Sequence, residues 1–246
     1  MFDDDLRGGL APATWDLSRD IDFDAVEVDK LTPEWIVRVR DVCLAELSGL
    51  EVTEPLLRDF HDDPGFHGFV SVWLCEEMGH HLVLRRYLER TGHPVERVRL
   101  PAHQPAAFRS PAIDTLTLRF CAERRLAERY GELSAEAPEP VLRRIFAILA
   151  VDELRHAAVY ARYLRQAVEG DPAVLPAVLR MALWAMRIGH RDSRRAAGAA
   201  VAPAASRGSD PHFFDRMMKV YRTLAPAMTG LASGCVGGTT ALGAAG

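Results

Sequence analysis

Two stretches of the sequence place a glutamate and a histidine one helical turn apart. "WLCEEMGHHLVL" contains Glu77 and His80, and "DELRHAAVY" contains Glu153 and His156. Residues i and i+3 lie about 60° apart around a helix with about 4.5 Å of rise, so both side chains can reach one ion. A single such pair is mostly a solvated accident on a charged helix. Two pairs that each continue an apolar helix face predict a shared metal site.

Helices are expected to position these pairs. From Thr32, with Thr32 as N-cap and Pro33 at the first helical position, apolar residues recur at helical spacing. Further helices are expected at about residues 66–91, 111–133, 141–168, 172–196 and 211–225. A long irregular segment beginning at "HPVERVRL" separates two helical hairpins, and no stretch alternates as a strand does. The pattern predicts an all-α fold, a ferritin-like four-helix bundle with additional C-terminal helices.

Composition limits the partners and the compartment. The formal charge of -4 provides no global basic field, which argues against nucleic acid as a partner. Cysteines 43, 75, 121 and 235 show no C-x-x-C spacing, and no secretory signal begins the chain, so a reduced, cytoplasmic protein without disulfides is expected. We expect one bundle domain over residues 1–225. The weakly hydrophobic, small-residue tail at 226–246 is predicted to be flexible rather than to enter a membrane.

A di-iron carboxylate site needs one more carboxylate from each of the other two helices, at the same height. In an antiparallel hairpin, residues at one level are equidistant from the turn. With the second turn centred near residues 137–138, Glu153 is level with residue 122, next to Glu123. With the first turn centred near residues 63–64, the level of Glu77 falls near residue 50, next to Glu51. If the centre of the first turn lies a couple of residues away, Glu46 or Glu54 is the first-helix ligand instead of Glu51.

The donor set indicates the metal. Four carboxylates offset the charge of two Fe(II) ions, and two neutral imidazoles complete a set of oxygen and nitrogen ligands that suits iron, with manganese possible at one position. Burial of four carboxylates without metal would be costly, which argues against a metal-free scaffold. Glu77 and Glu153 are expected to bridge the ions. The predicted ligands are Glu51, Glu77, His80, Glu123, Glu153 and His156.

Each pair is preceded by another acid, Glu76 and Asp152, four residues before a histidine. Such carboxylates are well placed to accept the free ring N–H of a metal-bound imidazole and to fix its tautomer. The alternative is that both are ordinary acids on a helix surface.

These motifs resemble those of the soluble acyl-carrier-protein desaturase family. "WLCEEMGHHLVLRRYLERTGHP" is similar to the family's W-x-x-E-E-x-x-H motif, "DELRHAAVY" to its D-E-x-R-H motif, and "FCAERRLAERY" to its third-helix E-R element. The similarity extends to about residue 225. It implies a di-iron, O2-dependent acyl desaturase that receives electrons from a ferredoxin-like donor and forms a homodimer.

The resemblance also suggests roles for single residues. It selects Glu51, because the family's first-helix ligand stands four residues before a proline, as Glu51 stands before Pro55. "TWDLSRDIDF" resembles a Trp-containing segment that the family shares with the small subunit of ribonucleotide reductase, which places Trp15 and Asp152 on an electron path to the His80 iron. One position departs from the family: Leu126 stands where a threonine is usual.

Other di-iron functions are alternatives. The same site could serve hydroxylation or N-oxygenation of a small molecule, or an oxidase like the small subunit of ribonucleotide reductase. The arylamine N-oxygenase subtype is disfavoured, because Leu149 stands where that family has a third histidine. Iron storage is disfavoured by the crossing segment and the extra helices.

An arginine cluster suggests how a carrier-bound substrate would dock. Arg187, Arg191, Arg194 and Arg195 follow an apolar helix face, which comprises Leu179, Met181, Leu183, Trp184 and Met186. Arginine clusters recognise acidic surfaces, such as that of an acyl carrier protein, through charge-assisted contacts. The face and the cluster together form the expected substrate entrance, unless the arginines are merely solvated and the face is ordinary core.

Overall fold

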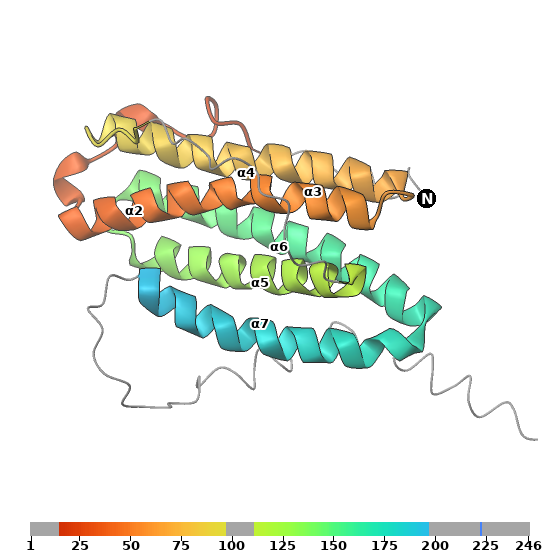
Figure 1. Cartoon of the computed structure of the whole chain (residues 1–246). Helices are drawn as coiled ribbons and strands as arrows, with labels where there is room; N and C mark the ends of the chain where they lie inside the picture. The colour runs from red at the N-terminus through yellow and green to blue at the C-terminus, as the bar shows by residue number, and fades with distance from the viewer. Residues whose placement is uncertain (1–14, 97–110, 197–221, 223–246) are drawn as a thin grey trace, which may run out of the picture.

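The computed structural model describes residues 15–96, 111–196 and Arg222. Within these ranges all regular structure is helical, which confirms the predicted all-α fold. Four long helical rods lie side by side as a ferritin-like bundle, and a fifth helix covers one side (Figure 1).

The first rod is interrupted, whereas the other three are continuous α-helices. It consists of α2 (Pro33–Ala45), the short 3₁₀ helix η3 (Glu46–Ser48) and α3 (Gly49–Asp59). The other rods are α4 (Pro64–Arg90), α5 (Ala112–Glu136) and α6 (Pro140–Gly170). Three further 3₁₀ turns are η1 (Phe23–Ala25), η2 (Val28–Lys30) and η4 (Pro172–Val174), and α7 spans Leu175–Ala196.

The rods form two antiparallel hairpins. The first pairs α2–α3 with α4, and the second pairs α5 with α6, while α4 and α5 run in the same direction (Figure 1). A parallel α4 and α5 require a connection that returns along the bundle, as in ferritin-like folds. Most of this predicted crossing segment, residues 97–110, lies outside the described ranges.

Helix caps explain where the first hairpin begins and turns. The Thr32 hydroxyl accepts a hydrogen bond from the backbone N–H of Trp35, and Pro33 is the first residue of α2, as predicted. The Asp63 carboxylate caps α4 in the same way, with Pro64 as its first residue. The expectation that this helix begins only at residue 66 was therefore wrong, because proline tolerates the first helical turn, where no N–H is needed.

The end of α4 is marked by a glycine in the left-handed conformation. Gly92 has φ of 79°, and the N–H of His93 donates to the carbonyl of Leu88 over 2.9 Å. This is the hydrogen-bond pattern of a Schellman motif, which favours glycine because it has no Cβ.

The interior has two apolar clusters with a polar layer between them. One cluster gathers Leu56, Phe66, Trp73, Leu116, Phe120, Tyr160 and Leu164 with neighbours, and the other gathers Ile36, Val39, Leu84, Tyr130, Leu142, Phe146 and Leu149 with neighbours. Along α4, α5 and α6 the change from one cluster to the other occurs at buried acids and histidines. The polar layer therefore crosses the bundle at one level.

The fifth helix packs outside the bundle, against α5. Val178 and Ala182 are its buried residues in the first apolar cluster. Of the five residues predicted to form its apolar face, Leu179, Met181 and Leu183 are only half-buried and Trp184 is 50% exposed. The buried face of α7 is thus rotated away from the expected one. The side chains of residues 186–196, which include the fifth residue, Met186, lie outside the described part of the chain.

The remaining expectations fall partly outside the described residues. The predicted helix at 211–225 and the tail at 226–246 lie almost wholly in undescribed ranges. Three of the four cysteines, Cys43, Cys75 and Cys121, are described and are free thiols. Among the helices that the structure describes, none combines the length and apolarity needed to cross a bilayer.

Candidate metal centre

Six side chains from the four rods meet in the polar layer. They are Glu46, Glu77, His80, Glu123, Glu153 and His156, and none is more than 4% exposed. Five of the six predicted ligands are thus brought together, whereas Glu51 is replaced by Glu46. Such a concentration of buried ionisable groups is unfavourable unless they are paired or hold a cation.

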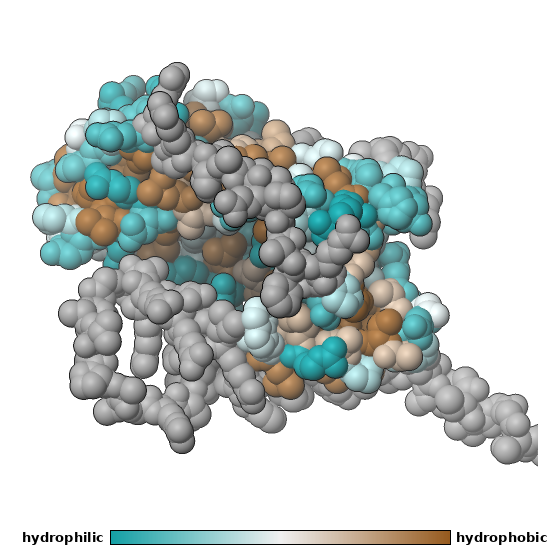
Figure 2. Space-filling view, viewed as in Figure 1, coloured by the Kyte–Doolittle hydropathy of each residue, from teal (hydrophilic) through white to brown (hydrophobic). Residues whose placement is uncertain are grey.

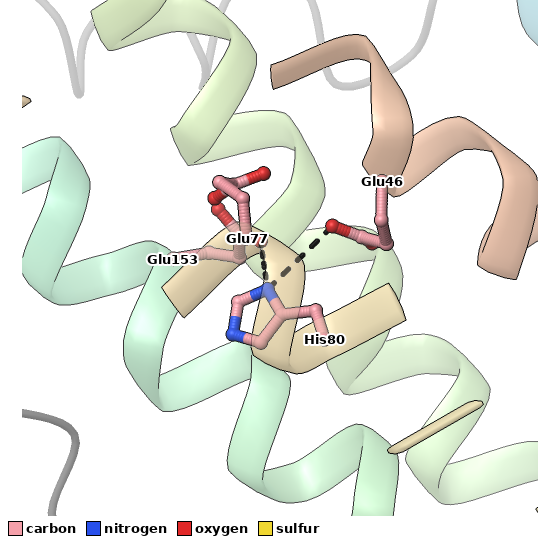
Figure 3. A group of neighbouring side chains, drawn as sticks. All are labelled: Glu46, Glu77, His80 and Glu153. Atoms are coloured by element: carbon pink, nitrogen blue, oxygen red, sulfur yellow. Dashed lines mark ion pairs between the residues drawn. The ribbon is translucent and has the colours of Figure 1, made fainter. Parts of the chain in front are cut away.

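The six residues form two overlapping groups. Glu46, Glu77, His80 and Glu153 have ligand atoms within 4.8 Å of one another, and so do Glu77, Glu123, Glu153 and His156. Two carboxylates therefore belong to both groups, and they are the two that were expected to bridge. The first group is drawn in Figure 3.

The two oxygens of Glu153 point to different histidines. Oε1 lies 3.4 Å from Nδ1 of His80, and Oε2 lies 3.5 Å from Nδ1 of His156. Each histidine also faces a carboxylate that it does not share: Glu46 Oε2 is 3.5 Å from His80 Nδ1 (Figure 3), and Glu123 Oε2 is 3.5 Å from His156 Nδ1. This arrangement suits two ions, each with one histidine, one carboxylate of its own and the shared pair.

Unpartnered polar atoms support this fit. Buried atoms without a hydrogen-bond partner include at least one ligand atom from every member of the cluster: Glu46 Oε2, Glu77 Oε1, His80 Nδ1, Glu123 Oε2, both oxygens of Glu153 and His156 Nδ1. A buried polar atom without a partner costs about 1–3 kcal/mol, so such a set of converging atoms indicates a cation-binding site. Two cations would satisfy all of them at once.

The pKa values of the cluster reflect its concentration of buried carboxylates. Burial raises the pKa of Glu46 to about 8, although its ion pair with His80 acts in the opposite direction. Burial alone would lower the pKa values of His80 and His156, but their contacts with the surrounding carboxylates raise both well above the usual value. Without metal, the cluster therefore retains protons in place of cations.

The two outer acids lie behind the histidines, but each pairs with the histidine of the other helix. Asp152 on α6 lies 3.2 Å from Nε2 of His80 on α4, and Glu76 on α4 lies 2.7 Å from Nε2 of His156 on α6. Both acids are buried, which excludes the alternative that they are ordinary surface acids. With Nε2–H donated to an acid, each histidine presents Nδ1 to the cluster.

Arg155 connects the two outer acids, a role that sequence reasoning missed. One guanidinium nitrogen lies 2.9 Å from Glu76 Oε1 and 2.9 Å from Asp152 Oδ1. Although burial opposes ionisation, hydrogen bonds from His80, Trp15 and Arg155 hold the pKa of Asp152 well below its usual range. Its position within the D-E-L-R-H stretch, three residues after Asp152, was a usable signal.

Trp15 extends the chain of contacts from His80 toward the surface. Its indole N–H donates to Asp152 Oδ2 over 2.6 Å, and its ring lies nearly parallel to that of His80, at 14° with 6.4 Å between centroids. Trp15 packs over Gly79, where an added Cβ would lie 3.9 Å from the indole. The predicted association of Trp15, Asp152 and His80 is therefore present as a continuous set of contacts.

The structure corrects Glu51. Glu51 and Glu54 are exposed on α3, whereas Glu46 is buried and faces His80. The reason is the turn: Asp63 caps α4, so the loop of residues 60–63 is centred between residues 61 and 62, and Glu46 is as far from that centre as Glu77. Moving the turn centre by one residue moves the position that lies level with Glu77 by two residues. The expected centre was about two residues further along the chain, so the expected ligand position fell about one helical turn after Glu46.

Two other residues near Glu46 were missed. Gly49 lets the first rod approach α4, because a Cβ there would lie 3.3 Å from Cβ of Glu77. The Tyr130 hydroxyl on α5 donates a hydrogen bond to Glu46 Oε1. Tyr130 lies seven residues after Glu123, two helical turns along the same face, which is the only sequence signal that it carried.

Comparison with known proteins identifies a similar fold. No family model matches the chain, and no curated protein matches it. Among solved structures, it is similar to the R2-like ligand-binding oxidase from Sulfolobus acidocaldarius, with a TM-score of 0.56 and 14% sequence identity. The match covers 89% of this chain and 86% of that one. At this identity the likeness concerns the fold, and the chain shares the helical-bundle fold of that oxidase.

Proposed function

We propose that this protein is a di-iron oxidase that uses O2 and externally supplied electrons to oxidise an unactivated acyl chain. The observation that carries the proposal is the pair of overlapping ligand groups, which share Glu77 and Glu153 between the four rods. Glu46, His80, Glu123 and His156 would complete the two positions. Two bound iron ions supply the O2 binding and the redox chemistry, and manganese at one position is compatible with the same donors.

The acids behind the histidines fix which ring nitrogen of each imidazole faces the cluster. Asp152 and Glu76 accept hydrogen bonds from Nε2 of His80 and His156, so both Nδ1 atoms face the metal positions. Arg155 forms ion pairs with both acids and helps to hold the pKa of Asp152 below its usual range. The contacts from Trp15 through Asp152 to His80 provide a route for electrons from a ferredoxin-like donor.

The proposed substrate is an acyl chain carried as a thioester on an acyl carrier protein. The support is the likeness of the "WLCEEMGHH", "FCAERRLAERY" and "DELRHAAVY" motifs to those of acyl-carrier-protein desaturases. A cytoplasmic homodimer without membrane or nucleic-acid partners is part of the same proposal. We also propose that the carrier docks on the arginine cluster of Arg187, Arg191, Arg194 and Arg195. The side chains of this cluster lie outside the described residues.

Figure 2 shows apolar side chains interspersed with polar ones on the visible face of the described helices. Isolated apolar side chains on a surface are normal and do not by themselves mark a binding site. The support for a carrier-bound acyl chain therefore lies in the sequence motifs.

A second candidate is oxidation of a small molecule, by hydroxylation, N-oxygenation or a reaction of the R2-like oxidase type. The observation that favours it is the shared fold with a protein named as an R2-like ligand-binding oxidase. In this case the ligand cluster has the same role and no carrier protein is required.

The two candidates are separated by one experiment. Metal-free protein is loaded with Fe(II) without oxygen, given a pulse of O2 with acyl-carrier thioesters or with free fatty acids, and the products are analysed by mass spectrometry. A loss of two hydrogen atoms from a carrier-bound chain supports the desaturase. Added oxygen in a free substrate supports the second candidate, and the absence of iron binding would exclude both.

A further inference from the structure

The two carboxylates that are not shared differ in one contact. Glu46 Oε2 faces His80 Nδ1 over 3.5 Å, and Glu123 Oε2 faces His156 Nδ1 over the same distance. The other oxygen of Glu46, Oε1, accepts a hydrogen bond from the hydroxyl of Tyr130. Among the residues that the structure describes, no tyrosine hydroxyl donates to Glu123, which instead contacts the shared carboxylate of Glu153.

Tyr130 is buried and packed against a second aromatic ring. Its side chain is 1% exposed, and its ring stacks on Phe146 with 5.9 Å between centroids and 21° between planes. The hydroxyl thus reaches from the continuous helix α5 to Glu46 on the first rod. Glu46 begins the 3₁₀ turn η3, where backbone hydrogen bonds are less well aligned than in an α-helix, so the hydroxyl adds a contact from a regular helix.

We propose that Tyr130 is a positioning residue that holds Glu46 as a one-oxygen ligand and so makes the two metal positions unequal. The inference rests on the proposed function, because it concerns the same two metal positions. With Oε1 engaged by the phenol, Glu46 presents Oε2 alone to the ion beside His80. The position beside His156 has no comparable tyrosine anchor on Glu123 among the described residues, so no hydroxyl reserves one of its two oxygens there.

Pre-organisation predicts the order of binding. A ligand that is already held in place loses little conformational entropy when the ion arrives, so the position of Glu46 and His80 binds the first ion. Loss of a hydrogen-bond partner behind a ligand typically lowers metal affinity by about 10–100-fold. Tyr130→Phe should therefore weaken the first position by this factor and leave the second nearly unchanged.

The test is titration of the metal-free protein with Co²⁺, followed by visible absorption. The wild type should bind two ions in two steps, and in Tyr130→Phe the first step should weaken and its absorption bands should shift. Tyr87→Phe is the matched control, because Tyr87 is a fully buried tyrosine whose hydroxyl donates to the buried Glu139 over 3.0 Å, outside the cluster. A purely structural loss would lower the melting temperature of both variants and leave Co²⁺ affinity and spectrum unchanged.

A double-mutant cycle separates this inference from the proposed function. Glu46→Gln should abolish one Co²⁺ position, and adding Tyr130→Phe should then cause no further change in the remaining position. Co²⁺ affinities and spectra in Tyr130→Phe that match those of the wild type would overturn the role of Tyr130 while leaving the di-metal site intact. A wild type that binds no Co²⁺ would instead overturn the proposed function itself.

Discussion

The imidazole of His156 on α6 lies 2.7 Å from the carboxylate of Glu76, which stands on α4 four residues before the other histidine. Asp152 and His80 form the reciprocal pair, so each helix supplies the acid for the histidine of its neighbour. This crossed arrangement ties α4 to α6 at the level of the cluster. It also means that a substitution at either acid should affect the metal position on the other helix.

Glu46 and Glu51 provide the first prediction. Glu46→Ala should lower the metal content from two ions to one, because it removes a carboxylate that only one position uses. Glu51→Ala is the control on the same rod and should retain two ions, because its side chain is exposed. Metal analysis of both purified proteins checks this, and one lost ion in the Glu51 variant would instead identify Glu51 as the ligand.

Glu153 should have a larger effect than either unshared carboxylate. Its two oxygens face both histidines, so Glu153→Ala should reduce iron content at both positions, whereas His80→Ala should reduce it chiefly at one. Iron stoichiometry and the Mössbauer spectrum of each variant measure this. Full iron occupancy in Glu153→Ala would contradict the bridging role.

Trp15 should govern electron transfer and not metal binding. Trp15→Phe removes the hydrogen bond to Asp152, so reduction of the oxidised centre by an external donor should slow while the iron content is maintained. The exposed Trp184 provides the control, since Trp184→Phe removes an indole from a different part of the surface. The measurement is stopped-flow reduction, and equal rates in the three proteins would remove Trp15 from the route.

Metal affinity should rise with pH. The pKa values of His80 and His156 are raised, and that of Glu46 is about 8, so near neutral pH these groups carry protons that a metal ion must displace. Co²⁺ should therefore bind more tightly as the pH rises from about 6.5 to 8.5 and should release protons. Calorimetry in buffers of different ionisation enthalpy measures both effects. A flat profile without proton release would show that these groups do not compete with the metal.

The same pKa values determine the stability of the metal-free protein. A group whose pKa is raised on folding stabilises the folded state below its unfolded value, and this contribution is lost as the pH rises through the folded value. For Glu46 the window runs from its usual 4.5 to about 8. Removal of metal by a chelator should consequently lower the melting temperature more at alkaline than at acidic pH.

The arginine cluster tests the nature of the substrate. Reversing the charge at Arg191 and Arg194 should raise KM for a carrier-bound acyl chain and leave kcat nearly unchanged, because docking contacts are equal in the ground and transition states. High salt should mimic the substitution. A wild-type KM in the variant, with activity independent of salt, would favour a free small-molecule substrate.

Local sequence patterns were sufficient for the helices and for most of the candidate site. The i, i+3 spacing places Glu77 with His80 and Glu153 with His156, whatever the rest of the chain does. Glu123 was also found, because the turn of the second hairpin spans residues 137–139, centred almost where it was expected. The outer acids, Glu76 and Asp152, follow from the same periodicity.

The tertiary structure decided which glutamate completes the site and which acid serves which histidine. The choice of Glu46 over Glu51 depends on the N-cap at Asp63 and on the 3₁₀ turn that begins at Glu46, and both change the height and direction of a side chain without changing the helical pattern. The crossed acids and the contact from Tyr130 depend on how α4, α5, α6 and the first rod pack together. Periodicity determines only which residues share a helix face, whereas contacts between helices depend on their relative rotation and height, which packing alone determines.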